Sequence, residues 1–187
     1  ILRISGILFR VYLADKIGAQ GIGLYQLIFL VYIFASTFAA SGISTAVTKL
    51  VAENLHNGKD YVNQIMRSAA LLTLLVATAS WCLVFFGADF IATYLLRDTR
   101  AVLSLKILSF SLFFIGLSSC ARGYFIARRK TIQPSIVQLI EQTIRIVIIC
   151  VCLSFFAKKG LAFCTASILF GDMLSELASF IINWLLY

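Results

Sequence analysis

The chain has 187 residues, of which 61% are hydrophobic and only 13% are charged, with a mean hydropathy of +0.98. A soluble domain of this size carries roughly 25% charged residues, so the composition excludes an ordinary soluble protein. The net charge of +8 is attributed mainly to membrane topology, and we expect no nucleic-acid partner. The apolar residues form successive runs of about 20 residues, each enough to cross a ~30 Å hydrocarbon layer, which predicts a polytopic membrane protein.

A single proline, repeated long apolar runs and no alternation of period two favour helices over barrel strands. We predict an all-α membrane protein with six transmembrane helices in one bundle over residues 1–187. The predicted spans cover residues 1–14 (a truncated run), 23–47, 68–88, 101–121, 132–156 and 160–187. The first run is shorter than the ~20 residues of a full span, and no initiating methionine precedes it, which indicates a fragment of a longer protein.

Glycine-rich and polar segments separate the first three spans. The sequence DKIGAQGIG at residues 15–23 holds three glycines, as a tight reversal requires. Gly42 marks a point where the second span could flex. The polar segment at residues 49–67 is expected to extend the helix, to turn at Asn57 and Gly58, and to re-enter the membrane.

Basic residues cluster in RGYFIARRK at residues 122–130, and such clusters belong on the cytoplasmic side of a membrane. We therefore predict that Lys130 is cytoplasmic and that Lys158, one span later, is outside. The five cysteines all lie in apolar runs without a CxxC pair, and His56 is the only histidine. No metal site or cofactor is expected, and the absence of a nucleophile–base constellation or a phosphate-binding glycine loop argues against an enzyme.

Charged side chains interrupt the fifth span, SIVQLIEQTIRIVIICV at residues 135–151. Glu141 and Arg145 lie one turn apart, on a helix face shared by Gln138 and Gln142. A charge near the bilayer centre costs on the order of 3 kcal/mol, and an i, i+4 pair cancels only part of that cost. We interpret the two charges as lining a functional pathway, with a static pair that fixes the helix register as the alternative.

The sixth span repeats this pattern with charges of one sign. Asp172 and Glu176 lie one turn apart on a polar face that also contains Ser175, Ser179 and Asn183. Two carboxylates this close in a low dielectric require a neighbouring cation or a shared proton. We predict a proton-sensitive pair close to Glu141 and Arg145, with simple pairing to arginines for packing as the alternative.

The first two spans also have polar faces. The first carries Arg3, Gly6 and Arg10 at helical spacing, and the second carries a row of hydroxyl groups at Thr37, Ser41, Ser44 and Thr48. Spans three and four are almost free of charge, so we predict that they are lipid-facing or scaffold helices. The polar faces of the other four are then expected to line a shared hydrated cleft. For Arg3 and Arg10 the alternative is that each reaches toward the nearer membrane surface.

Two stretches are similar to a known transporter superfamily. Residues 18–54, GAQGIGLYQLIFLVYIFASTFAASGISTAVTKLVAEN, resemble the first loop and second helix of the polysaccharide-export and stage V sporulation protein B branch of the multidrug/oligosaccharidyl-lipid/polysaccharide exporter superfamily. Residues 121–146, ARGYFIARRKTIQPSIVQLIEQTIRI, resemble the end of its fourth helix, the cytoplasmic turn and its fifth helix.

The resemblance implies a fold and a class of cargo. Members of this superfamily have two six-helix bundles around a central cavity and work by alternating access, and the six predicted spans match the first bundle only. Related lipid II flippases carry arginines along the first helix, which implies that Arg3 and Arg10 meet a lipid-linked pyrophosphate. The acidic residue near the end of that helix in the family has no clear match here. Multidrug members tend to have a cation-coupling aspartate on the first helix, which ILRISGILFRVYLA lacks.

We therefore predict the N-terminal bundle of a flippase in the bacterial cytoplasmic membrane, acting on undecaprenyl-pyrophosphate-linked saccharides or peptidoglycan precursors. Guanidinium groups stay charged and bind phosphate oxygens in pairs, and the predicted substrate-binding residues are Arg3, Arg10 and Arg145. The predicted coupling cluster consists of Glu141, Asp172 and Glu176. The expected partners are membrane lipid, the lipid-linked substrate, a second six-helix half and a coupling cation. A cation-coupled multidrug antiporter and a non-transporting membrane subunit are the alternatives.

Overall fold

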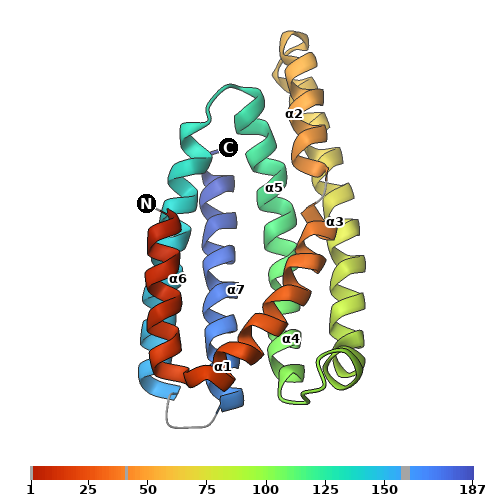
Figure 1. The fold of residues 1–187 in the computed structure, drawn as a ribbon. Coiled ribbons are helices and arrows are strands. Elements are labelled where there is room, and N and C mark those ends of the chain that lie inside the picture. Colours follow the sequence, from red (N-terminus) through yellow and green to blue (C-terminus); the bar gives the residue numbers. More distant parts are fainter. Residues whose placement is uncertain (1, 41, 157–160) are drawn as a thin grey trace.

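The computed structural model describes residues 2–40, 42–156 and 161–187 (Figure 1). Every regular element in these ranges is a helix, as predicted. In chain order they are α1 (Leu2–Ala40), α2 (Ile43–Glu53), the 3-10 helix η1 (Leu55–Asn57), α3 (Lys59–Phe90), the π-helix η2 (Ile91–Leu95), α4 (Ala101–Ser109), α5 (Ser111–Ala127), α6 (Ile132–Phe156) and α7 (Leu161–Leu185). The topology prediction for Lys158 lies outside the described residues.

Helix α1 contains the reversal expected at residues 15–23. Gly18 has φ 75° and ψ 173°, a positive-φ conformation that interrupts the helix and that glycine adopts without steric cost. Leu13, before Gly18, packs with Ile149 and Ile168 of α6 and α7. The segment after Gly18 runs obliquely toward α2 (Figure 1). Two helical segments of different direction are therefore joined at this glycine.

Two more glycines with positive φ lie at the two ends of the segment formed by α2 and η1. Gly42, at φ 73°, precedes the first residue of α2, and Gly58, at φ 94°, lies between η1 and α3. The turn expected at Asn57 and Gly58 is present, and the polar segment on either side of it is largely helical.

Five stretches of the described residues are long and apolar enough to cross a membrane: Val11–Glu53, Lys59–Leu95, Ala101–Ala127, Ile132–Ser154 and Phe163–Leu185. They correspond to the second through sixth predicted spans, and α6 has the predicted bounds. A sixth crossing at residues 1–14 is not confirmed, because this short helical segment continues into the rest of α1 across Gly18.

Helix α3 has the surface expected of a lipid-facing helix. Its large side chains Leu75, Leu83 and Phe86 are exposed, whereas the smaller Thr73 and Ala77 are buried against other helices. A continuous exposed apolar surface is rare in a soluble monomer and is normally covered by hydrocarbon in a membrane protein.

Helix α5, in the fourth predicted span, is central rather than lipid-facing. Eleven of its 17 residues are buried, and it packs against α1, α2, α3 and α7. Small residues such as Gly116 and Gly123 allow this close packing. Of the two roles predicted for this span, lipid-facing or scaffold, the packing of α5 supports the scaffold role. Composition did not separate the two roles, because small uncharged side chains suit contact with neighbouring helices as well as contact with lipid.

Candidate functional site

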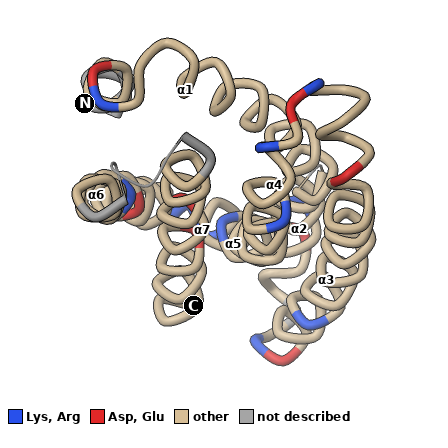
Figure 2. The backbone as a smooth tube through the Cα atoms, turned by 90° about the horizontal axis from the view of Figure 1, so that it is seen from below, with Lys and Arg blue, Asp and Glu red and all other residues tan. Residues whose placement is uncertain are grey.

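Helix α6 contributes an ion pair near its middle. Arg145 Nη2 donates a hydrogen bond to Glu141 Oε1 at 3.0 Å, one turn earlier on the same helix. Both charged side chains are largely removed from solvent, at 23% exposure for Arg145 and 13% for Glu141. In Figure 2 the charged positions of α6 lie on its side toward α7.

Helix α7 brings two more carboxylates to the same guanidinium. Asp172 Oδ1 lies 3.2 Å from Arg145 Nε, and Glu176 Oε1 lies 3.3 Å from Arg145 Nη2. Arg145 Nε also donates to Ser175 Oγ at 3.3 Å. The structure therefore brings together the four charged residues that the sequence singled out on the fifth and sixth spans, which we call the Arg145 cluster: Glu141, Arg145, Asp172 and Glu176.

The Arg145 cluster lies near the middle of α6 and α7, the part of a spanning helix that is expected at the bilayer centre. Each of its residues is within three positions of the middle of α6 or α7, which is about 4.5 Å along a helix axis. One guanidinium and three carboxylates give a formal charge of −2 when all are ionised. Charge at this depth is expensive and is usually retained for function.

The polar face of α7 is covered by protein. Asp172 is 4% exposed, and Ser175, Ser179 and Asn183 are more completely buried. The Asn183 amide donates to the Ser179 carbonyl at 2.9 Å, so part of this face bonds to its own helix. This face differs from the expected wall of a hydrated cleft, because α4, α5 and α6 pack against α7. The partly exposed Arg145 gives the cluster its more accessible side.

A glycine sets the distance between the two charged helices. A Cβ on Gly171 would lie 2.7 Å from Ile149 Cγ1 and 3.3 Å from Ile148 Cγ2 of α6. These distances are shorter than ordinary carbon contacts, so glycine allows α6 and α7 to approach this closely with Ile149 in its present position, and a larger residue would require Ile149 to move. Because Gly171 is next to Asp172, the same close approach places the α7 carboxylates beside Arg145.

The sequence did not identify three further residues near the cluster. Tyr32 of α1 and Arg122 of α5 both interact electrostatically with Glu176, and Tyr25 of α1 lies beside Asp172. The tyrosines resemble core aromatics in an apolar run, and Arg122 resembles the rest of its basic cluster. One available signal was that Arg122 precedes Arg128 by nearly two helical turns, which moves it toward the membrane interior.

Positions 3 and 10 both lie in the first segment of α1, but the side chains of Arg3 and Arg10 are outside the described part of the structure. Leu13, three residues after Arg10, is buried against α6 and α7. This segment therefore runs beside the two helices that carry the Arg145 cluster. Its role in binding a substrate stays a prediction.

The fold and the cluster define a multi-pass helical membrane protein with ionisable groups at the bilayer centre, an arrangement typical of proteins that move ions or substrates. The chain belongs to the polysaccharide biosynthesis protein family, whose model matches residues 1–187. This match confirms the resemblance to polysaccharide and lipid II flippases of the multidrug/oligosaccharidyl-lipid/polysaccharide exporter superfamily, and with it the membrane location.

Three proteins of Bacillus subtilis (strain 168) are similar to the chain. Stage V sporulation protein B is 29% identical over 180 residues, which cover 96% of this chain and 35% of that protein. The lipid II flippase MurJ is 24% identical over 156 residues, which cover 79% of this chain and 29% of that protein. The uncharacterized membrane protein YabM is 22% identical over 166 residues, 89% of this chain and 30% of that protein. The chain thus spans about a third of the length of these relatives, and no solved structure matches it significantly.

Proposed function

We propose that the chain is the N-terminal, six-crossing lobe of a two-lobe flippase that moves an undecaprenyl-pyrophosphate-linked saccharide or a peptidoglycan precursor across the bacterial cytoplasmic membrane. The two segments of α1 that meet at Gly18 form the first two crossings in this proposal. Family membership and the similarity to a lipid II flippase support the class of cargo. The greater length of the relatives supports the presence of a second lobe.

The observation that carries the proposal is the Arg145 guanidinium, which is paired with carboxylates from two helices at mid-membrane depth. A pair retained only for packing needs a single carboxylate. Three carboxylates exceed the positive charge of Arg145 and the neighbouring Arg122 together, and protons or a coupling cation can neutralise the excess. The Arg145 cluster therefore suits a site whose charge changes during a transport cycle.

In the proposed cycle, a proton taken up by Glu176 or Asp172 removes one negative charge and frees part of the Arg145 guanidinium. A guanidinium released from a carboxylate can bind two oxygens of a phosphate group. Arg3 and Arg10 add positive charge for the same pyrophosphate. Loss of the proton on the other side of the membrane restores the ion pairs and releases the cargo.

Substitution of Arg10 tests the cargo site. In the full chain as encoded, we expect Arg10→Ala to weaken binding of a lipid-linked pyrophosphate in native mass spectrometry, and Arg10→Lys to restore it only in part, because ammonium does not offer the paired geometry. The control for lost charge is Arg100→Ala, because Arg100 is an exposed cation outside the predicted spans. Unchanged binding in Arg10→Ala would remove this residue from the site.

The excess of carboxylates also favours a second candidate, a cation-coupled multidrug antiporter in which Glu141, Asp172 and Glu176 bind protons or sodium. The two candidates differ in the charge of the cargo. Binding of a cationic drug in competition with sodium, together with no affinity for lipid II, would replace the flippase with the antiporter.

A further inference from the structure

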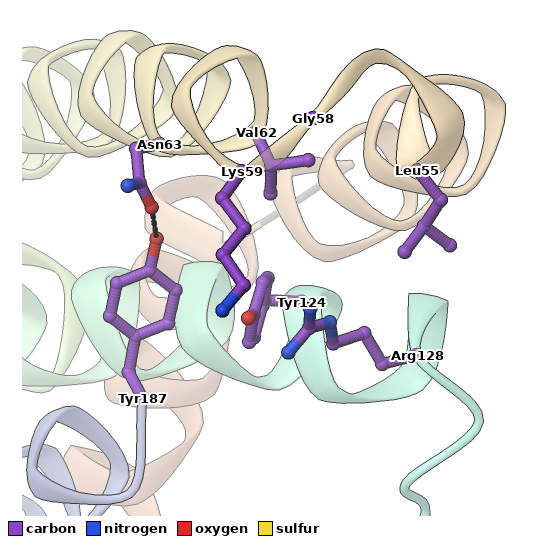
Figure 3. Close-up of a pocket in the computed structure, with 8 residues that line it drawn as sticks. All are labelled: Leu55, Gly58, Lys59, Val62, Asn63, Tyr124, Arg128 and Tyr187. Carbon is purple, nitrogen blue, oxygen red and sulfur yellow. Dashed lines mark hydrogen bonds between the residues drawn. The ribbon is translucent and has the colours of Figure 1, made fainter.

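A cavity of about 240 Å³ lies where the α2–α3 turn meets the ends of α5 and α7 (Figure 3). Lys59 and Arg128 extend toward it, and Tyr124 and Tyr187 form part of its wall. The Arg128 guanidinium lies over the Tyr124 ring, 5.1 Å from the ring centre. Within the described part of the chain, no carboxylate is within ion-pair distance of Lys59 or Arg128. The cavity thus holds positive charge without a counter-ion.

A larger hollow of about 660 Å³ adjoins this cavity. The two share Asn63 and Tyr187, and the Tyr187 hydroxyl donates a hydrogen bond to Asn63 Oδ1 at 2.9 Å at their junction. A phenol, with an ordinary pKa of about 10, is protonated at neutral pH, so Tyr187 remains a donor there. Beyond Arg67 along α3, the larger hollow is lined mainly by apolar residues: Ala70, Leu71, Leu74, Leu117 and Trp184.

The two hollows lie along one side of α3, and the residues of α3 that line them change from polar to apolar along the helix. Lys59, Asn63 and Arg67 come first, each one helical turn after the last, and Leu71 and Leu74 follow. From Lys59 to Leu74 the helix rises about 22 Å at ~1.5 Å per residue. That length is comparable to the distance from the headgroup region to near the centre of a bilayer. The neighbouring Asp60 lines neither hollow.

We propose that this groove binds an anionic phospholipid of the surrounding leaflet, with its phosphate among Lys59, Arg67 and Arg128 and an acyl chain along Leu71 and Leu74. Charge complementarity selects this occupant, because a zwitterionic lipid brings its own cation to the basic cavity. A soluble phosphate gains nothing from the apolar hollow. The groove shares no residue with the Arg145 cluster, so the proposal is independent of the proposed flippase function.

The charged end of the groove is tested by native mass spectrometry of the full chain, with phosphatidylglycerol and phosphatidylcholine of identical acyl chains. We expect tighter binding of phosphatidylglycerol, and a loss of about 25-fold in the Lys59→Gln, Arg128→Gln double variant, at about fivefold for each basic side chain near the surface. The matched control is Arg97→Gln with Arg100→Gln, which removes the same charge from exposed positions at the other end of α3. This control should keep parental affinity.

The apolar end is tested by Leu74→Trp, which fills the hollow while leaving the basic residues in place. We expect it to weaken phosphatidylglycerol binding, and we expect glycerol phosphate not to compete at equal concentration. Thermal unfolding of each variant without added lipid verifies that the variants are folded. Equal affinity for the two lipids, an equal loss in the control, competition by glycerol phosphate, or preferential retention of undecaprenyl phosphate would each overturn the proposal.

Discussion

Replacing Gly123 with alanine tests whether the close approach of α2 and α5 stabilises the bundle. A Cβ at position 123 would lie 2.7 Å from the Ser44 carbonyl oxygen, 3.2 Å from Ser44 Cα and 3.0 Å from Val47 Cβ. Two of these atoms belong to the backbone of α2, so rotation of a side chain cannot relieve the overlap and the helices must separate. Overpacking of this kind costs about 1–3 kcal/mol.

Two smaller effects accompany this cost. Separation of the helices lengthens the 3.0 Å hydrogen bond from the Thr48 hydroxyl to the Gly123 carbonyl, and such bonds contribute ~0.6 kcal/mol between membrane helices. Alanine in a helix is favoured over glycine by about 1 kcal/mol, which acts in the opposite direction. We therefore expect Gly123→Ala to lower the free energy of unfolding by about 0.6–2.6 kcal/mol.

Unfolding by titration with sodium dodecyl sulfate in mixed micelles measures this difference. Gly23→Ala is the matched control, because it is also a helical glycine but nothing lies within 4 Å of its added Cβ. The control should be as stable as the parent, or up to about 1 kcal/mol more stable. Equal stability of Gly123→Ala and Gly23→Ala would refute the role assigned to the α2–α5 contact.

Three other predictions concern the cluster and the topology. Gly171→Ala should push α6 from α7, which should lower the free energy of unfolding by about 1–3 kcal/mol and reduce transport by the full chain. Normal transport would show that the spacing beside Asp172 is not critical. Asp172→Asn and Glu176→Gln should each flatten the dependence of transport on pH, measured in proteoliposomes with an imposed proton gradient, and parental pH dependence in both would leave a structural role only. Single cysteines at Lys130 and Lys158 in a cysteine-free background should react with impermeant maleimide from opposite sides of the membrane. Reaction of both from one side would contradict the assignment of spans.

Local signals in the sequence were sufficient for much of the fold. The bounds of α6 follow from an apolar run that ends at polar residues on both sides, and the reversal at Gly18 follows from glycine spacing. The i, i+4 spacing also predicted that Glu141 and Arg145 share a helix face, which their 3.0 Å contact bears out. Each of these features depends on residues that are close in the chain.

Features that depend on packing between distant segments were harder to predict. The central position of α5 was missed because composition does not distinguish small residues that pack against helices from those that meet lipid. The proximity of Tyr32 and Arg122 to Glu176 was missed for a related reason, since it depends on how α1 and α5 cross α7. Helix periodicity gives the face on which a residue lies but not the helix that it meets.

The left-handed residue at Gly42 divides the second crossing into two parts, which contribute to different core clusters. Before it, Leu24, Ile28 and Val31 pack in one core cluster with residues of α4 and α7, and after it α2 packs against α5. An unbroken helix would transmit a tilt along its whole length, whereas a break in the helical hydrogen bonds allows each part to follow its own neighbour. Gly42 therefore lets the two parts of one crossing take different tilts within the same bundle.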